Sequence, residues 1–170
     1  MYTKILVPID GSASAERGLA EAISLAGITR AGLVILHVVD AYPLASNVLR
    51  AQDFEALRDM LRRTGHKLLA DAAFEATRGN VPATLLLREI EVDRVADCIE
   101  QVALESGCDL IVMGTHGRNG LDRFFMGSNA ELVLRNSRTP VLLVRTQPRT
   151  PTRSRPSPRT VSHTRAALLA

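Results

Sequence analysis

The sequence is poor in the features that mark membrane, secreted and metal-binding proteins. No stretch approaches the roughly 18 consecutive apolar residues needed to cross a bilayer. Asp10 interrupts the first apolar run too early for the hydrophobic region of a signal peptide. The two cysteines, Cys98 and Cys108, form no CxxC pair and have no histidine at metal-ligand spacing. We therefore expect a soluble, cytoplasmic chain whose cysteines are reduced and buried, with no membrane partner.

Acidic residues are missing from one long segment. Residues 147–170 hold five arginines, four of the eight prolines and no acid. All 18 acidic residues lie in residues 1–146 beside 16 of the 21 basic ones, so this part has a net charge of −2 although the chain has +3. No basic face typical of nucleic-acid binding is seen there. We interpret 147–170 as a disordered basic tail, either a solvated extension or an arm that contacts a polyanion or a partner.

What remains is the composition of one globular domain over residues 1–146. Of the 170 residues, 46% are hydrophobic and 23% are charged. Short apolar runs alternate with longer segments of helical period, which predicts strands at 4–9, 33–39, 83–87, 110–113 and 140–144. Helices are predicted at 13–26, 51–77, 93–106 and 128–136. This alternation favours an open, doubly wound, five-stranded parallel sheet with helices on both faces, a Rossmann-like α/β fold.

Several side chains in these helices have predicted roles. The apolar positions of the 51–77 helix leave four basic residues directed toward water. Asp93 can cap the helix after the third strand. Ser128 and Glu131 have the spacing of a capping box at the start of the last helix. The basic residues are Arg58, Arg62, Arg63 and Lys67.

A glycine-rich segment follows the fourth predicted strand. Gly114, Gly117 and Gly120 are spaced three apart, and Gly127 precedes Ser128 at the start of a helix. Glycines let successive backbone N–H groups approach one anion, and helix N-termini favour phosphate. Ligands of open α/β sheets bind beyond the carboxyl ends of the strands. The segment is therefore predicted to bind phosphate, with a purely structural glycine cluster as the alternative.

Other polar residues near this loop are open to two interpretations. Arg118 and Arg123 are either anion contacts or solvated loop arginines, and His116 alone is weak support for acid–base catalysis. Asp10, after the first strand, lies where a ribose or adenine would be placed, or it is a turn or cap carboxylate. The segment at 38–40 would supply an apolar wall for a base.

These motifs together resemble those of the universal stress protein family. The spacing Gly114-x2-Gly117-x9-Gly127-Ser128 occurs with KILVPIDGS at 4–12 and TPVLLVR at 139–145, so the resemblance covers about residues 1–146. It implies an ATP-binding member. It matches Pro8, Asp10 and Val38 to positions around the adenine and ribose. It matches the following to the phosphate loop and helix start: Gly114, Thr115, His116, Gly117, Arg118, Asn119, Gly120, Gly127, Ser128, Asn129 and Ala130.

The resemblance also implies a homodimer paired through the last strand, at Val141, Leu142, Leu143 and Val144. Two features depart from the family pattern. Residues 88–93 replace a glycine-containing turn, which leaves the start of the next helix open, and the basic tail is not covered.

The expected function is nucleotide-dependent regulation in stress adaptation, with ATP and Mg²⁺ bound and at most slow hydrolysis. A weak ATP hydrolase or phosphotransferase is the enzyme alternative, but the sequence has no GxxxxGK[ST] loop and no paired carboxylates positioned to hold Mg²⁺. A dimeric scaffold that uses no nucleotide is the other alternative. Nucleic acid is expected as a partner only through the basic tail.

Overall fold

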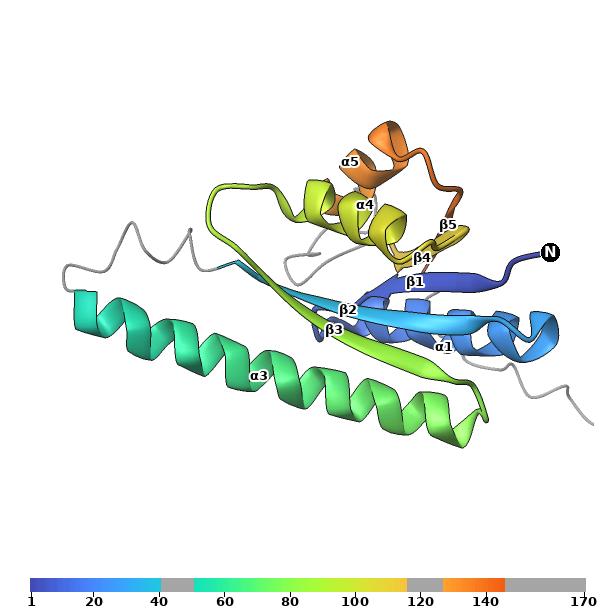
Figure 1. The fold of residues 1–170 in the computed structure, drawn as a ribbon, viewed down its shortest axis with the longest axis horizontal. Coiled ribbons are helices and arrows are strands. Elements are labelled where there is room, and N and C mark those ends of the chain that lie inside the picture. The colour runs from blue at the N-terminus through green and yellow to red at the C-terminus, as the bar shows by residue number, and fades with distance from the viewer. Residues whose placement is uncertain (41–50, 116–126, 146–170) are drawn as a thin grey trace, which may run out of the picture.

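The computed structural model describes residues 1–40, 51–115 and 127–145, which build a five-stranded parallel sheet flanked by helices (Figure 1). The strands are β1 (Lys4–Pro8), β2 (Gly32–Asp40), β3 (Ala83–Ile90), β4 (Leu110–Gly114) and β5 (Val141–Val144). The helices are α1 (Ala13–Thr29), α3 (Ala51–Arg78), α4 (Val95–Glu105) and α5 (Ser128–Asn136). The strand order β3-β2-β1-β4-β5 is doubly wound, which confirms the predicted fold class.

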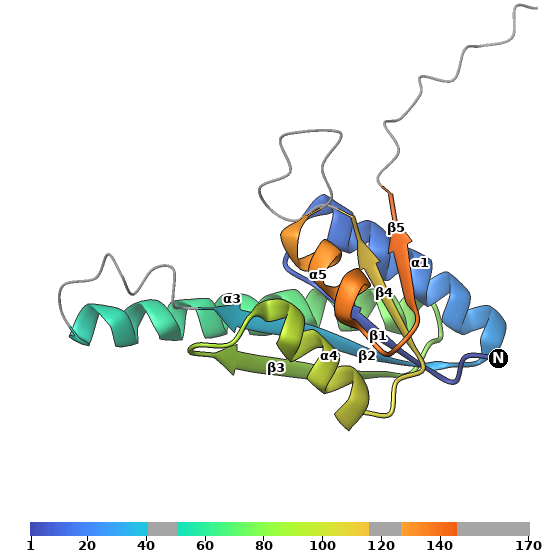
Figure 2. The same cartoon turned by 90° about the horizontal axis from the view of Figure 1, so that it is seen from above.

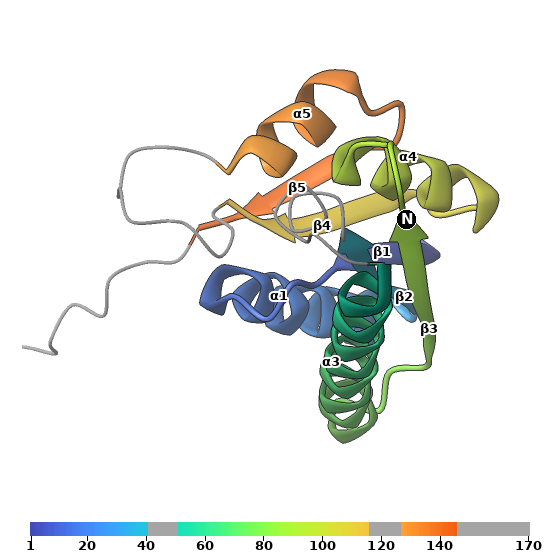
Figure 3. The ribbon, with the colours of Figure 1, turned by 90° about the vertical axis from the view of Figure 1, so that its left-hand side faces the viewer.

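Each face of the sheet carries its own apolar core. Alternate residues of a strand point to opposite faces, so Ile5 and Val7 of β1 pack on the side of α1 and α3, whereas Leu6 packs on the side of α4 and α5. Figure 3 shows these two helix pairs on opposite sides of the sheet. The three central strands are thus covered on both faces, as their near-continuous apolar sequences predict.

Strand β3 has α3 on one face and α4 on the other, but these helices cover it less completely than its apolar run predicts. It lies at the edge of the sheet and pairs with β2, from Leu33↔Ala83 to Asp40↔Ile90. Ala83, Thr84 and Leu85 are exposed, with 40% of Leu85 accessible. Its apolar run therefore belongs to an edge strand. The local sequence could not predict this, because the order of strands depends on the topology of the whole sheet.

The basic face of α3 is only partly solvated. Arg63 and Lys67 are exposed, as predicted. Arg58 and Arg62 instead reach across to Glu89 of β3, with Nε–Oε distances of 3.0 Å and 2.6 Å respectively. The prediction that these two arginines point toward water is therefore wrong, since a carboxylate 27 to 31 residues away in the sequence lies beside them.

Two helices have a different N-cap from the one that the sequence predicts, although α5 begins at its predicted residue. The N-cap of α4 is Arg94, whose carbonyl accepts from the N–H groups of Asp97 and Cys98, so Asp93 does not cap this helix. The N-cap of α5 is Gly127, with no side-chain cap. Ser128 is therefore the first helical residue and the predicted capping box does not form.

Both cysteines are free and buried, as predicted, each with 8% of its surface accessible. Burial raises the pKa of both thiols, Cys98 and Cys108, because it disfavours the thiolate. Within the ranges that the structure describes, no helix is both long and apolar enough to cross a bilayer. The tail at 147–170, predicted to be disordered, lies outside the described residues.

Candidate functional site

The predicted site lies where the winding of the sheet reverses. β1 and β4 are neighbours, with Ile5 opposite Leu110 and Leu6 opposite Ile111. The chain leaves β1 for α1 on one face of the sheet, while the helix that follows β4, α5, packs on the other face. The carboxyl ends of β1 and β4 therefore form a topological switch point, the place where open α/β sheets bind ligands.

The turn from β1 into α1 is held by its own polar side chains. Oδ1 of Asp10 accepts a hydrogen bond from the N–H of Ser12 at 2.9 Å, and Oγ of Ser12 caps α1 by accepting from the N–H of Ala15 at 3.2 Å. Gly11 between them has φ 78°, a left-handed conformation that favours glycine. Asp10 is thus a turn carboxylate, which is one of its two predicted roles, and it lies half-buried at the end of β1.

A buried histidine that sequence reasoning missed fixes the same turn. Nδ1 of His37 lies 2.8 Å from the carbonyl oxygen of Ile9, and the N–H of Ile9 donates to Leu36 at 2.8 Å. Because a carbonyl only accepts, Nδ1 carries the proton. Helix α3 passes close by, since a Cβ at Gly65 would lie 2.5 Å from Cδ2 of His37. The available signal was a single histidine inside the apolar run LVILHVV.

The end of β4 lies against the start of α1 (Figure 2). A Cβ at Gly114 would lie 2.3 Å from the carbonyl oxygen of Ser14, and one at Gly18 would lie 3.0 Å from the N–H nitrogen of Gly114. Both glycines therefore serve close packing of backbone against backbone. Gly114 was predicted as part of a phosphate loop, and its described role is this contact.

Thr115 joins three parts of the site. Its N–H donates to the carbonyl of Val144 at 3.1 Å, which extends the pairing of β4 with β5. Its carbonyl accepts from the N–H of Gly127 at 2.6 Å. Residues 115 and 127 are thus in direct contact although eleven residues separate them in the sequence. The end of β4, the end of β5 and the start of α5 therefore meet at Thr115, which is itself buried.

The first turn of α5 presents backbone donors at this point. Ser128 and Asn129 are exposed, and Ala130 is buried against the core. The first N–H groups of a helix have no carbonyl partner within it and favour an anion. In α5 the first hydrogen bond of the helix runs from the N–H of Glu131 to the carbonyl of Gly127 at 2.9 Å, so the N–H groups that precede Glu131 have no partner within the helix. No side chain of the described residues caps this end, so the arrangement suits a phosphate group.

The structure brings part of the predicted residue set together. Gly114, Thr115 and Gly127 are joined as described, and Ser128, Asn129 and Ala130 follow directly on α5. Pro8 ends β1 opposite Leu36, and Val38 lies two residues further along β2, half-buried. His116, Gly117, Arg118, Asn119 and Gly120, with Arg123, lie outside the described residues.

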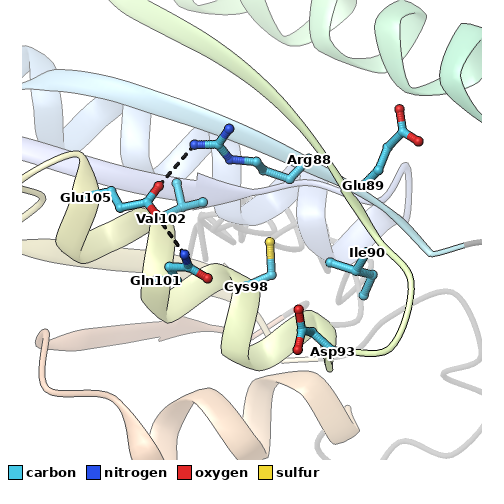
Figure 4. Close-up of a pocket in the computed structure, with 8 residues that line it drawn as sticks. All are labelled: Arg88, Glu89, Ile90, Asp93, Cys98, Gln101, Val102 and Glu105. Atoms are coloured by element: carbon cyan, nitrogen blue, oxygen red, sulfur yellow. Dashed lines mark hydrogen bonds and ion pairs between the residues drawn. The ribbon is translucent and has the colours of Figure 1, made fainter.

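A separate cavity of about 290 Å³ lies between the carboxyl half of β3 and α4 (Figure 4). None of the predicted site residues lines it. It adjoins the predicted base wall at 38–40 across the pairing of β2 with β3, because Arg88, Glu89 and Ile90 of its lining are the register partners of that segment. The cavity is thus a second feature of the molecule, distinct from the switch point.

Comparison with known proteins places the chain among related folds and sequences. The sequence model of the universal stress protein family matches residues 1–145. A universal stress protein of Bacillus subtilis is 34% identical over 151 residues, which cover 85% of this chain and all of that protein. A family protein from Burkholderia pseudomallei has a crystal structure similar to this one, with a TM-score of 0.70, 38% identity and coverage of 84% of this chain and 96% of that one. A universal stress protein crystallised in complex with cAMP is 25% identical, with a TM-score of 0.62 and coverage of 86% and 99%.

Proposed function

This chain belongs to the universal stress protein family, and on that premise we propose that residues 1–146 form an ATP-binding regulatory domain. The observation that carries the proposal is the hydrogen bond from the N–H of Gly127 to the carbonyl of Thr115, 2.6 Å long. It closes the base of the glycine-rich segment at the switch point. The adenine nucleotide bound by the cAMP-complexed relative supports the same ligand class.

The phosphates are assigned to the side of the site formed by β4 and α5. The N–H groups of Ser128 and Asn129, in the uncapped first turn of α5, would donate to phosphate oxygens. Ala130, packed beneath them, fixes the position of this turn. The segment from His116 to Gly120, with the positive charge of Arg118, supplies the remaining proposed contacts and the environment for a bound Mg²⁺.

The adenosine is assigned to the side formed by β1 and β2. Asp10 would accept from the ribose hydroxyls, while Pro8 and Val38 contribute apolar surface for the base. The turn that carries Asp10 is fixed by His37 through the carbonyl of Ile9. A rigid turn of this kind positions a carboxylate without an ordering cost at the moment of binding.

Nucleotide is proposed to act by being bound, with at most slow hydrolysis. ATP present at about 100 times its dissociation constant would stabilise the folded state by roughly 2.7 kcal/mol. The family resemblance adds a cytoplasmic homodimer paired through β5, whose Leu142 is 38% exposed. Val144, the last residue of β5, accepts a hydrogen bond from Thr115. Binding of nucleotide at the site would therefore affect the position of β5 and the proposed dimer interface.

Calorimetric titration of the full-length protein with ATP and Mg²⁺ tests the proposal. We expect micromolar binding that Gly127→Val weakens by at least about tenfold, because the added side chain obstructs backbone donors at the helix start. Gly27→Val is the matched control. Gly27 is exposed in the last part of α1, and a Cβ there meets nothing within 4 Å.

Two outcomes would contradict parts of the proposal. Absence of ATP binding in the wild-type protein favours the alternative of a scaffold that uses no nucleotide. Binding followed by rapid phosphate release, lost in Asp10→Ala, favours the alternative of an ATP hydrolase. A folded Gly127→Val protein with unchanged affinity would place the nucleotide elsewhere.

A further inference from the structure

The surface shared by β3 and α4 carries an excess of negative charge. Residues 88–105 contain six carboxylates and two arginines. We call this surface, from Arg88 to Glu105, the β3–α4 face. It lies at the opposite edge of the sheet from β5. The described chain packs no helix against β3 on this side other than α4, so the face is open beside the strand (Figure 3).

The cavity of about 290 Å³ opens within this face. Ile90 and Val102 give it apolar walls, and Figure 4 shows the sulfur of Cys98 turned from α4 toward β3. At one end Arg88 pairs with Glu105 at 3.1 Å, and at the other stands Asp93. The lining of the cavity is mainly polar, with Ile90, Val102 and Cys98 as its apolar part and Asp93 at one end. This combination suits a side chain with a cationic head and an aliphatic stem.

Some of the negative charge on the face is already matched. Glu89 is paired with Arg58 and Arg62, and Glu105 is paired with Arg88. Asp93 and Asp97 form no hydrogen bond or ion pair through their side chains within the described ranges. The thiol of Cys98, only 8% exposed, has no hydrogen-bond partner there either and faces the cavity. The unmatched groups therefore gather at the cavity and the start of α4.

One segment of this chain has the complementary charge. Residues 146–170 contain five arginines and no acid. A guanidinium group has the planar, forked donors that match a carboxylate, and its three-methylene stem can pack against Ile90 and Val102.

The connection also permits the contact within one chain. All strands are parallel, so the carboxyl ends of β5 and β3 lie on the same side of the sheet, and the cavity lies at the carboxyl half of β3. Four strand spacings separate β3 from β5, roughly 19 Å. The 25 residues from 146 to 170 reach up to about 80 Å when extended, which leaves ample length to cross.

We propose that the arginine-rich tail, residues 146–170, docks on the β3–α4 face and places an arginine side chain in the cavity beside Asp93 and Cys98. The tail then acts as an intramolecular ligand of the domain. A tail that docks on its own chain would cross the carboxyl ends of β4, β1 and β2 between β5 and β3.

Alkylation of the two cysteines in the full-length protein tests the docking. Cys98 faces the cavity, whereas Cys108 is equally buried, has a pKa raised for the same reason and does not line the cavity. Cys108 is therefore an internal control. We compare iodoacetamide labelling of each thiol, by mass spectrometry at low salt, in the wild type and in a full-length variant with the five tail arginines replaced by glutamine.

If about four-fifths of the molecules hold the tail docked, Cys98 should react about fivefold faster in the variant than in the wild type, with Cys108 unchanged. Sodium chloride at about 0.5 M should speed Cys98 in the wild type alone, because salt screens exposed charges beyond a few ångströms. Asp93→Asn with Asp97→Asn should act like the tail variant. The matched control is Glu21→Gln with Asp71→Asn, which removes two exposed carboxylates from other surfaces and should have no effect.

Equal Cys98 rates in the wild type and the tail variant would overturn the proposal. A parallel change at Cys98 and Cys108 would also overturn it, because that result reports general loosening of the fold. If the control pair of substitutions acted as strongly as the Asp93 and Asp97 pair, the tail would be responding to net charge and not to this face. Loss of oligonucleotide binding in the tail variant, with no change at Cys98, would assign the arginines to nucleic acid.

Discussion

The two long helices on one face of the sheet are held to it in different ways. Helix α1 touches β4 through glycine backbone, with no space for a Cβ at Gly114. Helix α3 packs Leu69, Ala72 and Ala76 into the core along its second half. Its first half is instead linked to β3 by Arg58 and Arg62 around Glu89. One attachment excludes solvent and the other lies at the surface.

This difference predicts how much each attachment contributes to stability. Overfilling a close-packed contact forces backbone to move, at a cost of roughly 1–3 kcal/mol. Ion pairs at a surface contribute about 0–1 kcal/mol, because water screens them and two long side chains must be ordered. The glycine contact between β4 and α1 lies at the candidate site, whereas the ion pairs lie on the first half of α3. Substitutions at each attachment can therefore separate site geometry from general stability.

The largest effect is expected at the glycine contact. Gly114→Ala places a Cβ 2.3 Å from the carbonyl oxygen of Ser14, and backbone atoms cannot swing aside as a side chain can. We expect a loss of about 3 kcal/mol in the free energy of unfolding and a fall in Tm of roughly 6–12 °C. Urea and thermal unfolding measure both.

Gly27→Ala is the matched control within α1, because a Cβ there meets nothing within 4 Å. Alanine favours a helix over glycine by about 0.5–1 kcal/mol, so this change should be neutral or stabilising. Similar losses from both substitutions would show that the contact between α1 and β4 is not the close-packed contact described above.

An intermediate effect is expected at Asp109, whose partners are largely fixed backbone groups. Its carboxylate accepts from the N–H of Thr3 at 2.8 Å and of Lys4 at 3.1 Å, and so links the starts of β1 and β4. Partial burial opposes its charge, but the hydrogen bond from the Thr3 hydroxyl, 2.8 Å long, together with these backbone bonds outweighs burial and lowers the pKa of Asp109. We expect Asp109→Asn to cost about 1–2 kcal/mol near neutral pH, measured by urea unfolding.

The pH dependence of that cost has a definite sign. A lowered pKa in the folded state means that the contribution is present above the ordinary pKa of an aspartate, about 4, and is lost as pH falls further. The difference between the wild type and Asp109→Asn should therefore stay constant from about pH 7 to 5 and shrink below pH 4. A difference that grew on acidification would contradict the assignment.

The smallest effect is expected at the ion pairs of α3. Hydrogen bonding from Arg62 lowers the pKa of Glu89, but the three side chains remain 24–35% exposed. We expect Glu89→Gln to cost less than about 1 kcal/mol in low salt and less still in high salt. A loss as large as that of Gly114→Ala would remove the distinction between the two attachments.

The parts of the fold that could be predicted are those that depend on local sequence patterns. The five strands begin and end within about three residues of their predicted limits, and the four helices lie where their apolar spacing places them. The N-caps were less predictable. Asp93 and Ser128 have good capping side chains, but the N-caps are the neighbouring residues Arg94 and Gly127.

The candidate site was predictable as a set of residue types and not as a set of contacts. The glycine spacing identified Gly114 and Gly127, whereas His37 was missed because one histidine in an apolar strand has no distinctive spacing. Its role depends on the carbonyl of Ile9, 28 residues earlier in the chain. The loop residues His116 to Gly120 remain predictions.

By itself, the sequence determined the alternation of strands and helices, the burial of both cysteines and the position of the glycine motif, because hydrophobic period and glycine spacing act over short stretches of chain. Only the tertiary structure decided that β3 is an edge strand, that Arg58 and Arg62 meet Glu89, and that Thr115 joins β5 to α5. These contacts join residues far apart in the chain, and only the packing of the strands and helices brings them together.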